Sequence, residues 1–114
     1  MSEFSITQTH RNDIAILEPS GYLDLHTVPE FENAIRALLG AEQYKIIVDM
    51  NKLTYISSAG LGVFMGFIEE IREHNGDIKL CALPPRVFKV FDLLGFPTLF
   101  NIYDTLEEAL AAFA

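Results

Sequence analysis

The sequence lacks most of the residues that covalent and metal-based sites require. Cys81 is the only cysteine among 114 residues, so neither an intramolecular disulfide nor a thiolate zinc cluster can form. No H-x-x-x-H spacing, C-x-x-C spacing or carboxylate cluster indicates another metal site. The G-K-[ST] motif of phosphate-binding loops is also missing. We therefore expect no metal and no cofactor, and the single cysteine favours a reducing, cytoplasmic location.

Basic residues are also scarce. Eight Lys and Arg stand against sixteen Asp and Glu, which gives a net charge of −8 at pH 7. This charge repels nucleic acid and anionic membrane surfaces, and it favours a partner with a basic patch. The longest apolar run in the middle of the chain, residues 61–68, is far shorter than the roughly 20 residues that span a bilayer. We expect no direct binding to nucleic acid and no membrane insertion.

Enough apolar material is present for one folded core. Hydrophobic residues make up 50% of the chain and charged residues 21%, which is typical of a globular protein. The length fits one ordinary domain, and the sequence has neither an internal repeat nor a linker. We therefore expect a single domain over residues 1–114, with its core at about 4–113.

Strand and helix patterns alternate along this domain. The β-branched run at 46–48 is typical of a strand covered on both faces, and apolar spacings of three and four indicate helices. The expected order is β-β-α-β-α-β-α-β-α, which predicts an α/β fold with a mixed, mostly parallel sheet of about five strands, four helices and an N-terminal antiparallel hairpin. The expected strands lie at 4–9, 14–17, 44–50, 77–83 and 99–103, and the expected helices at 28–39, 58–74, 86–94 and 105–113.

Several local features sharpen these expectations. Capping boxes are expected where Thr27 precedes Glu30 and where Asp104 and Thr105 precede Glu107. Glycines at the serine-led helix indicate close approach to neighbouring backbone, and a left-handed residue is expected where that helix ends; the residues concerned are Gly60, Gly62, Gly66, Asn75 and Gly76. The helix at 86–94 is expected to turn four apolar side chains inward, namely Val87, Phe88, Phe91 and Leu94.

The strongest candidate for a functional site is the start of the helix at 58–74. Ser57 and Ser58 lie there, where ligands gather beyond the strand ends of an open α/β sheet. A serine at a helix N-terminus can simply cap free N–H groups. The same N–H groups and the helix dipole would also favour a phosphate on that serine. Both interpretations are open from the residues alone.

Other reactive residues offer little support for catalysis. A serine nucleophile needs a base, but neither serine lies in a G-x-S-x-G motif, and His74 lies at the far end of the same helix. His26, close to Asp24, is best interpreted as a surface histidine, and Cys81 as a buried small hydrophobe. We expect no catalytic residue. Phe96 is expected to be partly exposed after a helix end, which makes it a candidate contact for a partner.

Four segments carry a family resemblance. Residues 49–51 read D-M-N and residues 55–64 read Y-I-S-S-A-G-L-G-V-F. Residues 21–24 read G-Y-L-D, with Thr27 following, and residues 87–96 fit V-x-x-x-F-x-x-x-G-F. Together they resemble the STAS domains of bacterial anti-sigma factor antagonists, over about residues 4–113.

This resemblance implies a phosphorylation switch. In that family an anti-sigma factor that is also a GHKL-type serine kinase phosphorylates the serine two residues before the G-L-G glycine, and a PP2C-type phosphatase reverses the reaction. That serine corresponds to Ser58, with Ser57 as the alternative, because the family often has Asp-Ser where this chain has Ser-Ser. The resemblance implies a partner-binding surface formed by Asp24, Ser57, Ser58, Gly60, Leu61 and Phe96.

The implied function is a partner switch by a protein that is not an enzyme. The unphosphorylated form would bind the anti-sigma factor, and the phosphorylated form would release it. The alternative is an adaptor subunit of a transporter or signalling complex, although an adaptor does not need a phosphoacceptor such as Ser58. A small hydrolase is the third interpretation, and it lacks a base, a metal and a phosphate loop. We expect a monomer or a weak dimer.

Overall fold

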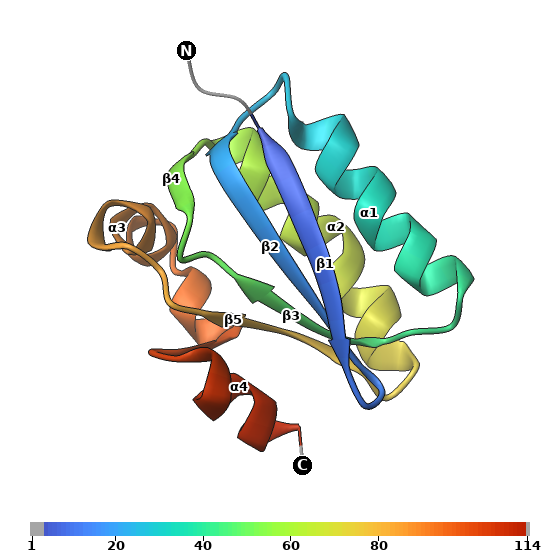
Figure 1. Ribbon diagram of the computed structural model, residues 1–114. Helices are drawn as coiled ribbons and strands as arrows, with labels where there is room; N and C mark the ends of the chain where they lie inside the picture. The colour runs from blue at the N-terminus through green and yellow to red at the C-terminus, as the bar shows by residue number, and fades with distance from the viewer. Residues whose placement is uncertain (1–3, 114) are drawn as a thin grey trace.

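A computed structural model describes residues 4–113, apart from the side chain of Phe96. Along the chain it has β1 (Ser5–Arg11), β2 (Ile14–Leu23), α1 (Val28–Gly40), β3 (Lys45–Asp49), β4 (Leu53–Ile56), α2 (Ser58–Glu73), β5 (Asp77–Cys81), α3 (Pro85–Leu93), a short 3-10 helix η1 (Phe96–Thr98), β6 (Asn101–Tyr103) and α4 (Leu106–Ala112). Figure 1 shows the arrangement: α1 and α2 lie side by side, α2 passes behind β1 and β2 in this view, and α4 lies near the C-terminus.

The sheet has the order β1-β2-β3-β5-β6, and β4 pairs with β2 beside this path. β1 and β2 form an antiparallel hairpin, and the other strand pairs are parallel. Single helices connect most of the parallel strands, as crossover connections require. The predicted α/β fold with an N-terminal hairpin is therefore confirmed.

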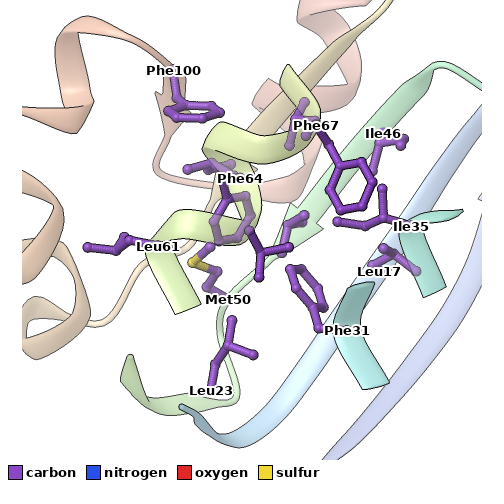
Figure 2. Packing of buried hydrophobic residues seen from close by; sticks show 14 of the residues in the cluster. Leu17, Leu23, Phe31, Ile35, Ile46, Met50, Leu61, Phe64, Phe67 and Phe100 are labelled. Atoms are coloured by element: carbon purple, nitrogen blue, oxygen red, sulfur yellow. The ribbon is translucent and has the colours of Figure 1, made fainter. Parts of the chain in front are cut away.

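Alternation along the strands divides the core into two layers. Ala15 and Leu17 of β2 pack with α1 and α2, whereas Ile14 and Ile16 face the smaller layer that contains Ala109 of α4. In the larger layer Phe64 of α2 is fully buried, and its ring lies 5.4 Å from Phe31 and 6.0 Å from both Phe91 and Phe100 (Figure 2). This aromatic cluster holds α1, α2, α3 and the segment before β6 together.

The sequence analysis missed one strand and placed several ends differently. β4, Leu53–Ile56, was not among the expected strands, so the sheet has six strands in the described residues instead of about five. β4 is only four residues long and its burial pattern does not alternate, because Leu53 and Ile56 are both buried and the two residues between them are exposed. The last strand is shorter than expected and covers only Asn101–Tyr103.

Both predicted capping boxes need correction. The Thr27 side chain does not cap α1, because its hydroxyl donates instead to the carbonyl oxygen of Tyr22 at 2.8 Å and accepts from the N–H of Asp24 at 2.9 Å. The box of α4 is complete, but it lies one residue further along than expected, between Thr105 and Glu108. The Thr27 hydroxyl is thus engaged in the preceding loop, and in α4 the side chain of Thr105, not of Asp104, accepts the N–H of the first turn.

The glycines of α2 divide into two kinds. A Cβ atom on Gly60 would lie 2.8 Å from the carbonyl oxygen of Leu23, so the predicted close approach is confirmed there. The prediction is wrong for Gly62 and Gly66, which are exposed, and a Cβ atom on either would have no heavy atom of a neighbouring segment within 4 Å. After α2, Asn75 has a φ of 64° and supplies the predicted left-handed residue.

Two of the four inward positions predicted on α3 are also wrong. Val87 and Phe91 are buried, but Phe88 and Leu94 are exposed. α3 is short and packs on β4 and the aromatic cluster through one narrow row of side chains, which includes Val87 and Phe91. Phe88 and Leu94 lie outside this contact.

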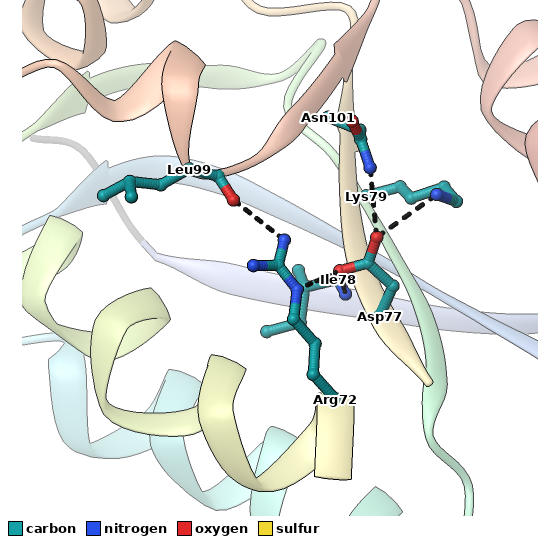
Figure 3. A network of polar contacts seen from close by, with 6 residues as sticks. All are labelled: Arg72, Asp77, Ile78, Lys79, Leu99 and Asn101. Carbon is teal, nitrogen blue, oxygen red and sulfur yellow. Dashed lines mark hydrogen bonds and ion pairs between the residues drawn. The ribbon is translucent and has the colours of Figure 1, made fainter. Parts of the chain in front are cut away.

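A polar network joins the far end of α2 to the last strands (Figure 3). Asp77 of β5 accepts hydrogen bonds from Arg72 Nε at 3.1 Å, from the N–H of Ile78 at 2.9 Å, and from Lys79 Nζ and Asn101 Nδ2 at 3.2 Å each. Arg72 also donates to the carbonyl oxygen of Leu99 at 2.8 Å. Lys79 is buried, so Asp77 supplies the counter-charge that makes its burial tolerable.

Replacement of Asp77 should therefore destabilise the protein. We expect Asp77→Ala to lower the free energy of unfolding by about 2–4 kcal/mol, because it leaves Lys79 buried without a counter-charge. Urea unfolding measures this change. Asp92→Ala is the matched control, since Asp92 is exposed on α3, and it should change the free energy by less than about 0.5 kcal/mol. Equal effects of the two variants would contradict the role of the network.

Asp49 at the end of β3 should make stability depend on pH. Burial and the nearby charge of Glu18 raise its pKa above the ordinary value of 3.8, against the opposing effects of the N–H of Asn51 and of Lys52. The ionised carboxylate therefore costs stability above the raised pKa, and this cost disappears below the ordinary pKa. We expect Asp49→Asn to raise the urea midpoint at pH 7 and to have a much smaller effect near pH 4. A constant difference across this range would contradict the prediction.

Candidate functional site

The predicted serine site forms where β2 and β4 end side by side. Leu23 of β2 pairs with Ile56 of β4, and the next residue, Ser57, donates its N–H to the carbonyl oxygen of Leu23 at 3.0 Å. This hydrogen bond joins the start of α2 to the loop that begins at Asp24. The fold thus brings together Asp24, Ser57 and Ser58, which the sequence analysis had grouped.

The two serines have different roles at this helix start. Ser57 is the N-cap: its backbone is extended, and its Oγ accepts from the N–H of Gly60 at 3.3 Å. Ser58 is the first helical residue and is exposed, whereas Ser57 is half-buried. A cap was considered possible for either serine, and the structure assigns it to Ser57. The hydroxyl of Ser58 makes no hydrogen bond within the described residues.

Electrostatics at the start of α2 favour a negative group. The helix is 16 residues long, it has no acidic residue in its first turn, and Arg72 lies in its last turn. The first N–H groups of a helix have no intrahelical acceptors, and the helix dipole places partial positive charge there. An anion attached to Ser58 would lie at this positive end.

Asp24 is held by its own turn. Its Oδ1 accepts from the N–H of His26 at 3.0 Å and from the N–H of Thr27 at 3.3 Å. The carboxylate forms no hydrogen bond to Ser57 or Ser58 in the part of the chain that the structure describes. Asp24 therefore shapes the loop beside the serines and contributes a fixed negative charge to this surface.

Gly60 and Leu61 support the site from inside the protein. Leu61 is 1% exposed and packs in the main core, and Gly60 lies against the backbone of Leu23. Their side-chain positions were expected to belong to the partner-binding surface, but they face inward because they lie on the stripe that anchors α2. The side chain of Phe96, another expected contact, lies outside the described residues.

Three exposed apolar side chains beside the serines were not singled out from the sequence. Tyr22 is 46% exposed, Tyr55 is 42% exposed and Leu25 is 73% exposed. The rings of Tyr22 and Tyr55 pack on each other with their centroids 5.5 Å apart. Their pairing depends on the register of β4 against β2, and β4 was not among the strands expected from the sequence.

The groups that a catalytic or metal site would need lie elsewhere. His10 contacts Gln43, the His74 ring contacts the backbone of Glu70, and no hydrogen bond joins the ring of His26 to either serine within residues 4–113. Cys81 is fully buried, and burial raises the pKa of its thiol to about 12. No group of three or more metal-ligating side chains is found among the described residues.

Among the described residues, no helix has the length and apolar character that crossing a membrane requires.

Known proteins resemble this chain over most of its length. A family model described as STAS domain matches residues 5–109. BtrV of Bordetella bronchiseptica, provisionally named an anti-sigma factor antagonist, is 32% identical over 93 residues, which cover 82% of this chain and 80% of BtrV. The anti-sigma-B factor antagonist of Listeria monocytogenes is 28% identical over 89 residues, or 78% of each chain.

A solved structure shares both the fold and part of the sequence. The anti-sigma factor antagonist SpoIIAA in its unphosphorylated form has a TM-score of 0.80 at 25% identity, with 97% of this chain and 96% of that chain covered. The phosphorylated form of SpoIIAA from Bacillus has a TM-score of 0.74 at 23% identity, with 98% and 100% covered, and so shows the same fold. Together with the family model over residues 5–109, these likenesses show that the chain is a STAS-domain protein of the bacterial anti-sigma factor antagonist family.

Proposed function

We propose that this protein antagonises an anti-sigma factor by partner switching at Ser58. In the unphosphorylated state it binds an anti-sigma factor that is also a GHKL-type serine kinase. Phosphorylation of Ser58 releases that partner, and a PP2C-type phosphatase restores the binding state. The protein is the substrate of these two enzymes and catalyses no reaction itself.

The observation that carries this proposal is the different environment of the two serines. Ser57 holds the helix start through the N–H of Gly60, whereas Ser58 is exposed and has a free hydroxyl within the described residues. A kinase can therefore reach Ser58 without opening the helix. The existence of phosphorylated and unphosphorylated SpoIIAA structures supports a phosphorylation switch on this fold.

The charge of the phosphate explains how binding would be lost. A phosphoserine adds about −1.5 to −2 charges at pH 7. The segments around the site, residues 21–29 and 53–64, contain no Lys or Arg, so they offer the phosphate no cationic side chain. The helix dipole holds the phosphate in place without refolding, and the new charge faces the partner. A partner surface that is complementary to the neutral Ser58 hydroxyl is then no longer complementary to the charged phosphoserine.

The phosphoacceptor can be identified by intact mass after incubation with ATP and each purified anti-sigma serine kinase encoded in the same genome. We expect one added phosphate on the wild type and on Ser57→Asn, and none on Ser58→Ala. Asn is a good N-cap, so Ser57→Asn removes the hydroxyl and keeps the helix start. Ser57→Ala should instead lose about 0.5–2 kcal/mol of stability, a cost that Ser58→Ala should avoid. If Ser58→Ala still gained a phosphate, the assignment of Ser58 would be contradicted. If no variant gained a phosphate from kinases that phosphorylate their own substrates, the result would favour the alternative function as an adaptor subunit.

Binding to the same kinase tests the charge switch. We expect Ser58→Ala to bind as tightly as the wild type and to resist release by ATP, because it cannot accept the phosphate. Ser58→Asp should bind at least about tenfold more weakly, although a carboxylate carries less charge than a phosphate. Isothermal titration calorimetry measures both affinities. Equal affinity of the two variants would show that charge at this position does not control binding.

A further inference from the structure

An exposed aromatic pair lies near the strand ends that lead to Ser58. Tyr22 of β2 and Tyr55 of β4 are paired residues, and each leaves more than two fifths of its surface in contact with solvent. Leu25, in the loop that follows β2, is even more exposed at 73%. We refer to Tyr22, Leu25 and Tyr55 as the aromatic rim. Single exposed apolar residues are common, but a packed pair of rings with a neighbouring leucine is a feature of interaction surfaces.

A bulge in the strand pairing creates this rim. Gly21 pairs with Leu53, but Tyr22 pairs with Tyr55, so Thr54 is an extra residue on β4. The Thr54 hydroxyl donates to the carbonyl oxygen of Gly21 at 3.0 Å, and Gly21 has a φ of 100°. Bulges of this kind redirect side chains.

The bulge buries side chains on one face of the β2–β4 pair and exposes them on the other face. Strict alternation over four residues cannot bury both ends of β4, yet Leu53 and Ile56 are each 1% exposed. The extra residue allows both to face the core and allows Tyr55 to lie outside, opposite Tyr22. Without it, Tyr55 would face Leu23 and the rings would not pair. The local backbone thus holds two large side chains in solvent.

The rim lies close to the proposed switch along the chain, and the two segments that form the rim and the switch carry little charge. Tyr55 lies two residues before Ser57, whose N–H binds the carbonyl oxygen of Leu23, the neighbour of Tyr22. Residues 53–64 contain no Asp, Glu, Lys or Arg, and residues 21–29 contain only Asp24, although the whole chain carries −8. A partner can cover this surface while removing few charges from water.

We propose that the aromatic rim is the apolar anchor by which the anti-sigma factor binds the unphosphorylated protein. The inference rests on the proposed function, because it states which residues supply most of the binding free energy at the same interface. The partner is expected to present an apolar recess that receives both tyrosine rings, with Ser58 at its edge. Tyrosines lose little conformational entropy on binding, and packed aromatic side chains dominate many interfaces.

Titration of the kinase that phosphorylates Ser58 against rim variants tests this assignment. Tyr22→Thr and Tyr55→Thr remove the rings and keep a residue with high strand preference, and circular dichroism checks that each variant folds. We expect each to raise the Kd at least about tenfold, and Leu25→Ala to raise it about threefold or more. Tyr22→Phe and Tyr55→Phe keep the paired rings and should stay within about threefold of the wild type.

Leu99→Ala is the matched control for Leu25→Ala. Leu99 is also an exposed leucine outside the helices and strands, but it lies near Arg72 at the opposite end of α2, and its contact with Arg72 uses only its backbone oxygen. We expect it to leave the Kd unchanged within about twofold.

The outcomes separate this inference from the proposed function. If the threonine variants bind like the wild type while Ser58→Asp loses affinity, the rim is not the anchor and the phosphorylation switch stands. If no kinase binds or phosphorylates the wild type, both are overturned. If the variants change only self-association, measured by sedimentation velocity, the rim covers a second copy of this chain and the inference is wrong.

Discussion

The position of the functional helix depends on how closely its first turn approaches Leu23. The carbonyl oxygen of Leu23 accepts the N–H of Ser57 at 3.0 Å and lies 2.8 Å from where a Cβ of Gly60 would be. Any larger residue at Gly60 must push the helix away from β2 and weaken that hydrogen bond. The capping serine, the exposed serine and the Asp24 loop keep their relative positions because this contact is tight.

Most of the fold follows from short-range patterns in the sequence. The β-branched run of β3 and the apolar stripe of α2 each indicate one element with little ambiguity, and single helices between strands imply parallel pairing. β4 could not be predicted this way, because its bulge removes the alternation by which a strand is recognised. The side-chain cap predicted at Thr27 was wrong, because its hydroxyl bonds to Tyr22 and Asp24 in the preceding loop, which the spacing of Thr27 and Glu30 does not reveal.

The site was predicted less completely than the fold. The pair of serines was found from its place at a helix start, and Asp24 from motif resemblance; both specify positions and leave the geometry open. Which serine caps α2 depends on backbone dihedral angles, and Ser57 has the extended values, φ −98° and ψ 173°, that an N-cap requires. The burial of Leu61 and the exposure of Tyr22 and Tyr55 depend on long-range packing and register, which no local pattern in the sequence contains.

The firm attachment of α2 to Leu23 also has a consequence for the timing of a signal. Ser58 extends from a helix that is already in place, so under the proposed switch neither adding nor removing a phosphate would have to wait for a segment to fold. The duration of each state would then be set by the two modifying enzymes, and the domain itself would add no delay. Under the proposed switch, the state of the protein would be stored in a single covalent bond, the phosphate ester at Ser58.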